Sequence, residues 1–558
     1  MADDISRRKF LAGSGAALGA VALGGSASSL LAACGGGGKA TGSGSATTSN
    51  PNAGISSAPP KRGGTVIFAT EAEDNGFNPT IASWDVTGLI YGAAIFDTLV
   101  AIDINGRPQP YLAQSVTPSA DAKTFTITAR PGIKFHDGTP LDGKAVAMTL
   151  EANVKSAQNG PALFNVANIT QSGPMTVTVT CKESWPAFPN YLTGSIGTVM
   201  SPTMLAEPNS GNLKPIGTGP FVFKEWVPND HLTVVRNPGY WQPSLPHLDQ
   251  VTFRPIPNDT TRIDALKAGD IDMMHTSQPS SVHQLMSDKS LVSITDLNNN
   301  HTEREVHFLY VNMDKPPFDD LRVRQALAYA TDRNRVRSVV DVVNPVIDSP
   351  FVPGSPYYTP VDYPSYNPAK AKQLIDAYQA DKGPLRVFEL ATVNDPQDLE
   401  RMTLVQAMWK AAGINCEIQQ VEQSQYIVQL LKGEFDVREG RQFSANDPDE
   451  NYVWWSSATA APIGQLALNF PRNKDPQIQA DLEKGRTSLN QADRVAAYQN
   501  IARRLAADIP YVWLDEAVWL VSAKPKVMNF NNPSLPNGSP ALRMSAGFVS
   551  FGKVWLNQ

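Results

Sequence analysis

The chain has 558 residues, several times the length of an ordinary domain, so we expect more than one compact unit. Its formal net charge is −6 and no basic run follows Lys9, which argues against nucleic acid as a partner. Three cysteines are too few for a disulfide framework or a thiolate zinc site. We expect Cys181 and Cys416 to be two separate buried thiols.

Residues 1–33 have the pattern of an export signal. Arg7, Arg8 and Lys9 precede an uncharged stretch rich in Ala, Gly and Ser, which leads into Leu31-Ala-Ala-Cys34. The Arg7-Arg8 pair resembles the signals read by the Tat system, and the segment ending at Cys34 resembles the bacterial lipoprotein box, in which the cysteine is lipidated. We therefore expect an exported, lipid-anchored protein in the periplasm or on the outer face of the cytoplasmic membrane. A plain signal peptide and a retained transmembrane anchor are the alternatives.

Residues 34–61 are predicted to be a disordered linker, because Gly, Ser, Thr and Ala leave almost no apolar surface to bury. The folded body begins with a strand signal after Arg62-Gly-Gly. The next predicted elements are alternating strands at 124–129 and 175–181, a helix at 141–154, strands at 221–226 and 232–235 joined by a Pro-Asn-Asp turn, and a helix at 260–268 that Gly269 ends.

The second half of the chain continues to mix helices and strands. The stretch 318–330 predicts a helix with Asp319 as its N-cap and with Arg322 and Arg324 in a solvated charged end. Further on we expect a helix at 368–379, a strand at 385–390, a helix at 399–412, a strand at 414–420, a helix at 493–508 and a strand from Tyr511. The strand-helix-strand order indicates an α/β fold with two lobes or more.

Four clusters occur in a fixed order along the body. They are Phe125-Thr-Ile-Thr-Ala-Arg-Pro-Gly-Ile-Lys-Phe-His-Asp-Gly-Thr-Pro-Leu141; Pro215-Ile-Gly-Thr-Gly-Pro-Phe221 with Arg236-Asn-Pro-Gly-Tyr-Trp241; Thr261-Arg-Ile-Asp-Ala-Leu-Lys-Ala-Gly-Asp-Ile-Asp272; and Val311-Asn with Pro317-Phe-Asp-Asp-Leu-Arg-Val-Arg-Gln-Ala-Leu327. Together they resemble the solute-binding proteins of ABC importers, in the peptide and nickel class known as family 5. The resemblance covers about Arg62 to the C-terminus.

This resemblance implies a two-lobed periplasmic-binding-protein-like clamp with an extra N-terminal subdomain and two inter-lobe crossovers. The crossovers are expected near His301–Val306 and Leu520–Lys526. The expected division is lobe I at 62–108, 217–300 and 522–558, the extra subdomain at 109–216, and lobe II at 301–521.

Two motifs allow a sharper interpretation. His136 could be a ligand or a catalytic base, but no partner His or Cys lies near it, and Asp137-Gly138 is turn chemistry, so we predict a packed turn. Residues 217–220 could suggest a phosphate loop, but they lack the Lys-Ser/Thr and the following helix that such a loop needs. A tight turn is the favoured interpretation there too.

The stretch Gly440-Arg-Gln-Phe-Ser-Ala-Asn-Asp-Pro448 departs from the family pattern. In peptide-carrying relatives it resembles G-W-x-x-D-x-x-[DE]-P, whose middle Asp holds the α-ammonium of the peptide. Here Arg441 stands at the Trp and Ser444 at that Asp. A hydroxyl cannot neutralise an ammonium, and a buried charge without its partner costs about 3–5 kcal/mol. We hypothesise that Arg441 faces the cleft and favours a carboxylate or phosphate. A surface or salt-bridge role for Arg441 is the alternative.

Candidate ligand contacts are polar or aromatic residues of this stretch and aromatic residues elsewhere. The set is Arg441, Phe443, Ser444, Asp447, Trp84 and Trp454, with Tyr91 and Trp455 as further aromatics. At least one of Trp454 and Trp455 is expected in the core, since neighbouring side chains point to opposite sides.

The leading functional hypothesis is a non-enzymatic receptor that captures a small solute, a peptide or a peptide-like or other small molecule, by lobe closure and delivers it to an ABC permease and ATPase. We expect a monomer with no cofactor and no metal. The alternatives are an exported hydrolase and a sensor lipoprotein on the same scaffold. The hydrolase is disfavoured because the sequence contains neither Gly-x-Ser-x-Gly nor His-Glu-x-x-His.

Overall fold

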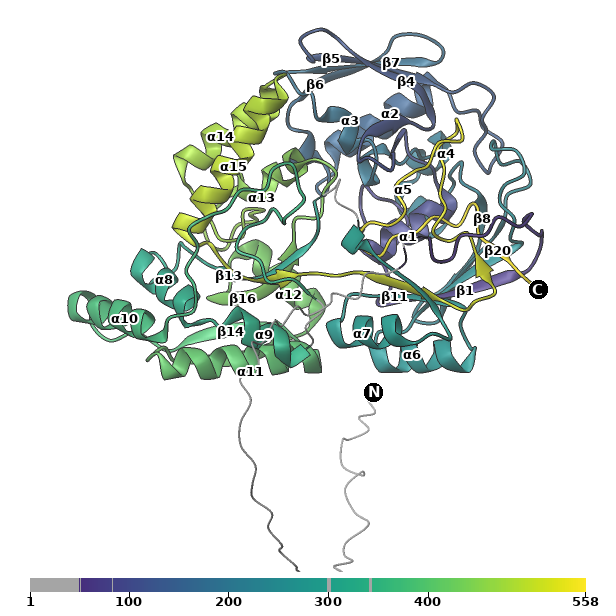
Figure 1. Ribbon diagram of the computed structural model, residues 1–558. Helices are drawn as coiled ribbons and strands as arrows, with labels where there is room; N and C mark the ends of the chain where they lie inside the picture. Colours follow the sequence, from purple (N-terminus) through teal and green to yellow (C-terminus); the bar gives the residue numbers. More distant parts are fainter. Residues whose placement is uncertain (1–49, 51, 83, 299–302, 341–343) are drawn as a thin grey trace, which may run out of the picture. The chain divides into compact units, whose positions relative to one another are not determined.

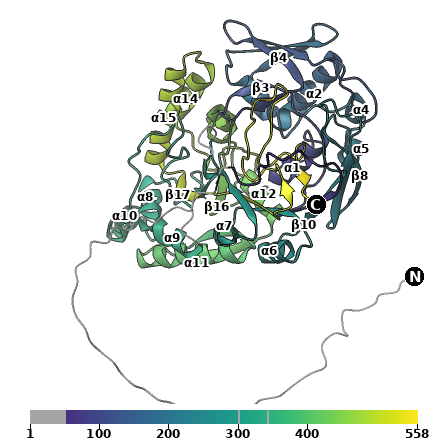
Figure 2. The ribbon, with the colours of Figure 1, turned by 45° about the vertical axis from the view of Figure 1, so that its right-hand side comes forward.

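The computed structural model describes residues 50, 52–82, 84–298, 303–340 and 344–558, which form an α/β structure built on three main sheets (Figures 1 and 2). The predicted signal segment with Arg7, Arg8 and Cys34, and most of the predicted linker, lie outside the described residues. Within the described ranges, none of the helices combines the length and the apolar character needed to span a bilayer.

The first sheet has seven strands in the order β12-β18-β11-β1-β10-β9-β8. Its strands are β1 (Thr65–Thr70), β8 (Phe221–Val227), β9 (His231–Arg236), β10 (Gln250–Pro255), β11 (Met273–Thr276), β12 (Val292–Thr295) and β18 (Leu520–Ala523). Side chains of β1 alternate between its faces: Val66 and Phe68 pack with α1 (Val86–Ile95), whereas Ala69 packs with α6 (Asp259–Ala268) and α7 (Pro279–Ser287). Because β1 and β11 are parallel, their carboxyl ends meet at one edge.

A separate antiparallel sheet has the order β4-β5-β7-β6. Its strands are β4 (Ala113–Pro118), β5 (Thr124–Ala129), β6 (Val166–Gln171) and β7 (Thr176–Cys181), and α2 (Gly143–Lys155) packs on it. Short helices α3 (Phe188–Tyr191), α4 (Pro202–Ala206) and α5 (Pro208–Leu213) follow. The predicted alternation is confirmed, since Phe125 and Ile127 of β5 are buried and the threonines between them are more exposed.

The third sheet has five strands in the order β15-β14-β16-β13-β17. They are β13 (Val306–Val311), β14 (Phe388–Val393), β15 (Cys416–Val421), β16 (Val437–Gln442) and β17 (Tyr511–Glu516). One face packs against α8 (Leu321–Ala330), α9 (Arg333–Val340), α10 (Pro368–Lys382) and α11 (Pro396–Ala411). The other face packs against α12 (Gln423–Lys432), α13 (Tyr452–Trp455), α14 (Pro476–Thr487) and α15 (Gln491–Asp508). The predicted strand-helix-strand unit is confirmed, because α11 joins the parallel strands β14 and β15.

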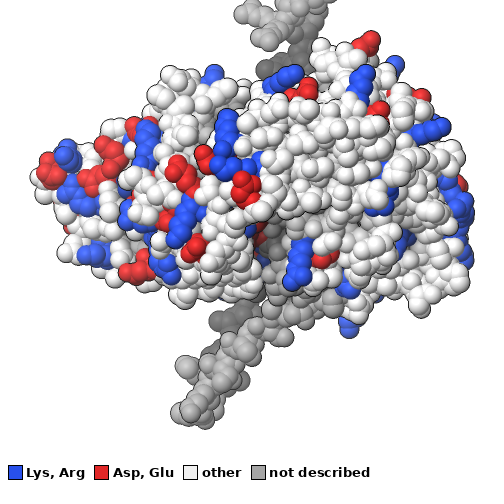
Figure 3. All heavy atoms as spheres, turned by 90° about the horizontal axis from the view of Figure 1, so that it is seen from above, with Lys and Arg blue, Asp and Glu red and all other residues white. Residues whose placement is uncertain are grey.

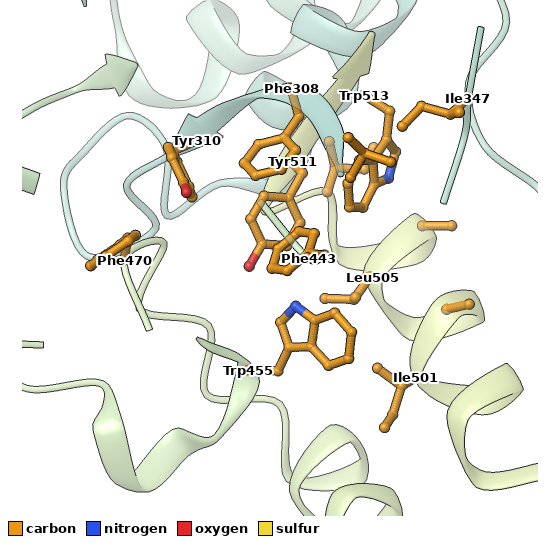
Figure 4. Close-up of a cluster of buried hydrophobic side chains, with 14 of the residues drawn as sticks. Phe308, Tyr310, Ile347, Phe443, Trp455, Phe470, Ile501, Leu505, Tyr511 and Trp513 are labelled. Carbon is orange, nitrogen blue, oxygen red and sulfur yellow. The ribbon is translucent and has the colours of Figure 1, made fainter. Parts of the chain in front are cut away.

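Aromatic side chains fill the core on the second of these faces (Figure 4). Phe308 of β13 stacks on Phe443 at 5.2 Å between ring centroids, and Tyr511 and Trp513 of β17 meet Phe308 edge-on. Trp455 closes the cluster 5.1 Å from Phe443. Large buried rings of this kind supply much of a core's stabilisation and fix its geometry.

Local signals placed most elements correctly, with small shifts at their ends. Gly269 ends α6 in the left-handed conformation with φ 92°, as predicted. The predicted N-cap of α8 is wrong by one residue: Asp320, not Asp319, accepts the N–H of Arg322 at 2.9 Å. Arg324 is buried rather than solvated, because its guanidinium donates to the carbonyl oxygens of Phe318 and Asp508 at 2.7 Å.

Both cysteines of the body are buried and unbridged, as expected. Cys181 ends β7 and Cys416 begins β15, in two different sheets. Burial raises the pKa of the Cys181 thiol to about 11 and that of Cys416 to about 12, so both are protonated at neutral pH.

The chain moves between the seven-stranded and five-stranded sheets twice. It enters the five-stranded sheet through residues 303–305 and leaves it through residues 517–519. The predicted second crossover at Leu520–Lys526 instead begins with β18, which pairs with β11 and β12. Asp515 and Glu516 directly precede this connection, but both are buried members of β17, so this polar pair does not mark an exposed turn.

The surface carries charges of both signs. On the face drawn in Figure 3, basic and acidic side chains are interspersed and wide areas carry neither. This distribution fits the modest net charge of −6.

Candidate functional site

The turns predicted around His136 and Gly217 pack against each other. The Gly217 N–H donates to His136 Nδ1 at 3.4 Å, and His136 Nε2 lies 3.1 Å from the Gly219 carbonyl oxygen. Burial lowers the pKa of His136, so the ring is neutral, with its proton on Nε2. A Cβ at Gly217 would lie 2.2 Å from the Ile95 carbonyl oxygen, so only glycine fits. These motifs build a junction beside α1, which supports the packed-turn interpretation for both.

Asp97 is the polar centre of that junction. It accepts hydrogen bonds from Thr218 Oγ1 at 3.0 Å, Tyr240 OH at 3.0 Å and Trp241 Nε1 at 2.9 Å. Burial raises the pKa of Asp97 to about 6. The second family cluster therefore serves to join the four-stranded and seven-stranded sheets. A cavity of about 30 Å³ beside Asp97, lined also by Tyr111 and Lys553, has room for one water molecule rather than for a solute.

Arg441 lies where the two large sheets meet. It belongs to β16 and pairs in register with His307 of β13. Its guanidinium reaches residues at the carboxyl ends of β1 and β11: Nη2 lies 3.1 Å from Glu71 Oε1, and Nη1 donates to Ser277 Oγ at 2.5 Å. Nε lies 3.6 Å from Glu305 Oε2, in the first connection between the sheets. In open α/β sheets, ligands bind outside the carboxyl ends of strands, so this position suits a binding site.

Trp519, in the second connection, completes the surroundings of Arg441. The guanidinium lies 4.9 Å from the indole centroid, and His275 stacks on the indole at 5.4 Å. The indole N–H donates to Glu305 Oε2 at 2.8 Å, and the Glu71 N–H donates to His275 Nε2 at 3.1 Å. Burial lowers the pKa of His275 to about 4, so this ring is neutral. Both connections between the sheets thus contribute side chains to the group around Arg441.

The charges around Arg441 favour its ionised pairs. Desolvation acts to raise the pKa of Glu71, but the charge and hydrogen bond of Arg441, together with His275 and Arg262, lower that pKa below its ordinary value. The Arg441 side chain nevertheless stays 34% exposed. A guanidinium carries five N–H donors, and the three contacts with Glu71, Ser277 and Glu305 leave two of them for another group.

Three more polar residues lie near Glu71: Trp84 and Asp85 at the start of α1, and Asp74 in the loop that follows β1. Asp85 caps this helix by accepting the N–H groups of Thr87 at 2.8 Å and Gly88 at 3.3 Å. Asp85 is exposed, yet surrounding protein atoms raise its pKa and the charge of Glu71 raises it further. Trp84 is partly buried, and Asp74 is buried.

The remaining predicted contacts have other surroundings. The Phe443 side chain is 2% exposed in the aromatic core, and Ser444 is exposed. Asp447 caps the 3-10 helix Pro448–Asn451 and pairs with Arg494 at 2.6 Å. Trp454 packs on Phe470 at 5.5 Å, and Trp455 and Tyr91 are each 2% exposed in cores. Of the predicted set, only Arg441 and Trp84 lie in the group of polar residues described above.

Sequence reasoning missed most of this group. Glu71 and Ser277 each follow the end of a strand that meets at one sheet edge, and Trp519 lies in a connection three residues long. The rule that ligands bind beyond the carboxyl ends of strands could have pointed to Glu71 and Ser277. No local signal distinguishes Trp519 from the buried strands on either side of it.

Two α/β sheets joined by two connections, with polar side chains of both meeting beside those connections, define a two-lobed solute-binding protein. The family model described as "Bacterial extracellular solute-binding proteins, family 5 Middle" matches residues 107–462, and the chain belongs to this family. The expected fold class is thereby confirmed. The family is one of binding proteins that serve ABC importers, and this chain is such a solute-binding protein.

Individual relatives differ in what their names say they bind. The glutathione-binding protein GsiB of Pectobacterium atrosepticum is 25% identical over 432 residues, 74% of this chain and 81% of the relative. The nickel-binding periplasmic protein of Escherichia coli is 27% identical over 462 residues, 78% of this chain and 86% of the relative. The Helicobacter pylori periplasmic binding protein DppA, solved with the peptide STSA, has a TM-score of 0.77 at 24% identity, covering 89% of this chain and 99% of its own; this likeness concerns the fold alone.

Proposed function

We propose that this protein captures a small solute, a peptide or a peptide-like or other small molecule, between its two large sheets and delivers it to an ABC permease and ATPase. It acts as a monomer, without catalysis. After Tat export directed by Arg7 and Arg8, lipid on Cys34 holds it at the membrane, and the part of the predicted linker before residue 50 gives the body its reach. The end of the predicted linker is not disordered as expected, because Ala53 and Ser56 are hydrogen-bonded to Asn531 and Asn529 of the body. The observation that carries the proposal is the set of contacts made by Arg441, which bring side chains of both sheets together beside both connections.

The proposed moving parts follow the sheets. Lobe I comprises 62–108, 217–298 and 520–558, with the extra subdomain at 109–216, and lobe II comprises 306–516. The connections at 303–305 and 517–519 act as the hinge. A solute shifts such a clamp towards its closed form only if it makes better contacts there, so residues that touch across the boundary report on closure.

A second contact across the proposed boundary supports closure. Trp185 Nε1 of the subdomain donates to Asp449 Oδ2 of lobe II at 2.6 Å, and Tyr191 OH donates to the Asp449 carbonyl oxygen at 2.6 Å. The Asp449 carboxylate also accepts from Arg486 Nε at 2.8 Å. Opening of the clamp would separate the first two contacts and leave the ion pair of Asp449 and Arg486 within lobe II.

We further propose that Arg441 binds a carboxylate or phosphate of the solute through the two N–H donors that its present partners leave over. The alternative is that Arg441 only joins the lobes through Glu71 and Glu305. The two roles differ in how the affinity for a given solute depends on Arg441. A direct charged hydrogen bond is worth about 1.5–3 kcal/mol, or roughly tenfold to a hundredfold in affinity, whereas an inter-lobe bridge acts on closure for every solute alike.

The test begins with the mature protein purified from membranes without denaturation. Native mass spectrometry identifies the co-purified solute, and calorimetric titration then compares the wild type with Arg441→Ala and with the exposed control Arg503→Ala. We expect at least a tenfold loss of affinity for Arg441→Ala, none for the control, and recovery of the solute chemically unchanged. An unchanged affinity for Arg441→Ala would falsify its direct role. Conversion of the solute would favour the hydrolase instead.

A further inference from the structure

Polar atoms without a partner gather at the first turn of α1, on the lobe I side of Arg441. Among the described residues, Asp74 Oδ2, Trp84 Nε1 and Thr87 Oγ1 are buried and make no hydrogen bond. The Asp74 residue is 7% exposed and Thr87 is 0% exposed. Buried polar groups in native proteins are nearly always paired, so two such atoms at the start of α1 and a third from the loop after β1 indicate a place completed by another molecule.

These atoms lie close together. A Cβ built on Gly88 would stand 1.9 Å from Asp74 Oδ2 and 2.9 Å from Trp84 Cγ, so the Asp74 carboxylate and the indole meet over Gly88. The indole continues along the helix to Gly92, where a Cβ would lie 2.6 Å from its ring. Thr87 precedes Gly88 in the same turn. The absence of side chains at positions 88 and 92 thus creates the space that the carboxylate and the ring occupy.

The charge of this region is negative. Glu71, Asp74, Asp85 and Glu305 are its carboxylates, and the guanidinium of Arg441 pairs with the first and the last of them. Within the described part of the chain, neither Asp74 nor Asp85 forms an ion pair: Asp85 accepts backbone N–H groups of α1, and Asp74 accepts the N–H of Asn75 at 2.6 Å. Asp85 meets the positive end of the helix dipole, so that end is already occupied.

We propose that Asp74, Trp84 and Asp85 form a subsite for a cationic group of the solute, an ammonium or guanidinium that carries a hydrogen-bond acceptor next to it. The cation would satisfy Asp74 Oδ2 and Thr87 Oγ1 and lie against the indole face. The adjacent acceptor would take the Trp84 N–H. Exposed Asp85 and partly exposed Trp84 form the entrance, and buried Asp74 lies deeper.

This inference rests on the proposed function and names the class of solute more closely. With an anionic group at Arg441 and a cationic group at Asp74, the solute is zwitterionic, as amino acids, peptides and their conjugates are. The two charged ends face opposite lobes, so both are satisfied only when the clamp is closed.

The test uses the full mature protein and pairs of probes that differ in one charge. Di- and tripeptides with uncharged side chains are each compared with their N-acetylated or deaminated analogues by thermal shift and calorimetric titration. We expect saturable binding of at least one zwitterionic probe and at least tenfold weaker binding of its partner that lacks the cation. Asp74→Asn and Asp85→Asn should each weaken the zwitterionic probe at least tenfold, while Asp264→Asn, an exposed carboxylate on α6, should leave it unchanged. Asn caps helices as well as Asp does, so Asp85→Asn keeps α1 intact.

The outcomes separate this inference from the proposed function. The subsite is overturned, and the receptor function is not, if a probe binds equally well without its cationic group. The same holds if neither Asp74→Asn nor Asp85→Asn changes the affinity of the zwitterionic probe. The subsite is likewise overturned if no cationic probe binds but a neutral or anionic probe does. Absence of any saturable solute, co-purified or added, overturns both.

Discussion

In the absence of solute, the free energy of unfolding of Asp74→Asn should rise relative to that of the wild type as the pH increases. An Asp in an unfolded chain has a pKa of about 3.9. Burial, and then the charge of Asp85, raises the pKa of Asp74 to about 7 in the folded protein. A tenfold difference in proton affinity is worth about 1.4 kcal/mol, so full deprotonation of folded Asp74 costs about 4 kcal/mol of stability. Asn resembles the neutral acid in size and does not titrate.

The sign follows from the raised pKa. The favourable contribution of protonated Asp74 is complete below pH 4 and is lost as the pH rises towards 7 and beyond. About 2 to 3 kcal/mol of this loss falls between pH 5 and pH 8. Urea unfolding followed by tryptophan fluorescence, at pH 5 and pH 8, measures it. The stability of Asp74→Asn relative to the wild type should rise by about 2 kcal/mol over this interval, and that of Asp264→Asn should not.

Other buried acids do not obscure the comparison. Burial raises the pKa of Asp296, Glu303 and Glu450 to about 8, but these groups titrate equally in the wild type and in the variant. Only the difference between the two proteins is interpreted. If that difference changes by less than about 0.5 kcal/mol between the two pH values, Asp74 does not hold a raised pKa and the reasoning from its burial is wrong.

Three further changes test separate parts of the structure. Arg486→Met leaves the fully buried Asp449 carboxylate without its ion pair and should lower the free energy of unfolding by about 3–5 kcal/mol, measured by urea unfolding, with part of the loss recovered when Asp449→Asn is added. Cys34→Ala should move the protein from the membrane fraction to the soluble exported fraction; retention in the membrane would contradict lipid anchoring. Gly217→Ala places a Cβ 2.2 Å from the Ile95 carbonyl oxygen and should cost about 1–3 kcal/mol in the same unfolding assay; an unchanged midpoint would contradict the close packing of that turn.

Elements with local signals were predictable from the sequence. The helix ended by Gly269 and the unit formed by β14, α11 and β15 depend on capping, turn chemistry and periodicity, which operate over a few residues. The second connection at 517–519 was harder to predict, because the only polar pair beside it, Asp515 and Glu516, is buried within β17, and the apolar residues 517–519 resemble the strand that follows. Burial patterns mark the ends of a strand only where a polar or turn residue interrupts them.

The candidate site was harder to predict because its members come from distant segments. Arg441 was identified through its departure from a family pattern, whereas Glu71, Ser277 and Trp519 join it only through the fold. Phe443 illustrates the opposite difficulty. Strand alternation would put it on the same face as Arg441, but its positive φ of 79° turns its ring into the aromatic core instead.

The departures at positions 441 and 444 and the unpaired acids of lobe I have one explanation in common. In the pattern of peptide-carrying relatives, lobe II supplies the carboxylate that holds an ammonium, and this chain has Ser444 there. The negative charge reappears on the opposite side, at Asp74 and Asp85, while lobe II contributes the cation Arg441. The proposed subsite would therefore hold a zwitterionic solute in the direction opposite to that pattern, which is the reversal that the following experiment tests. Acetylating the amine of the solute should then weaken binding to the wild type but not to Asp74→Asn or Asp85→Asn. Amidating its carboxylate should weaken binding to the wild type but not to Arg441→Ala. If both modifications act through the same residue, the two charged ends do not face opposite lobes and the reversal is refuted.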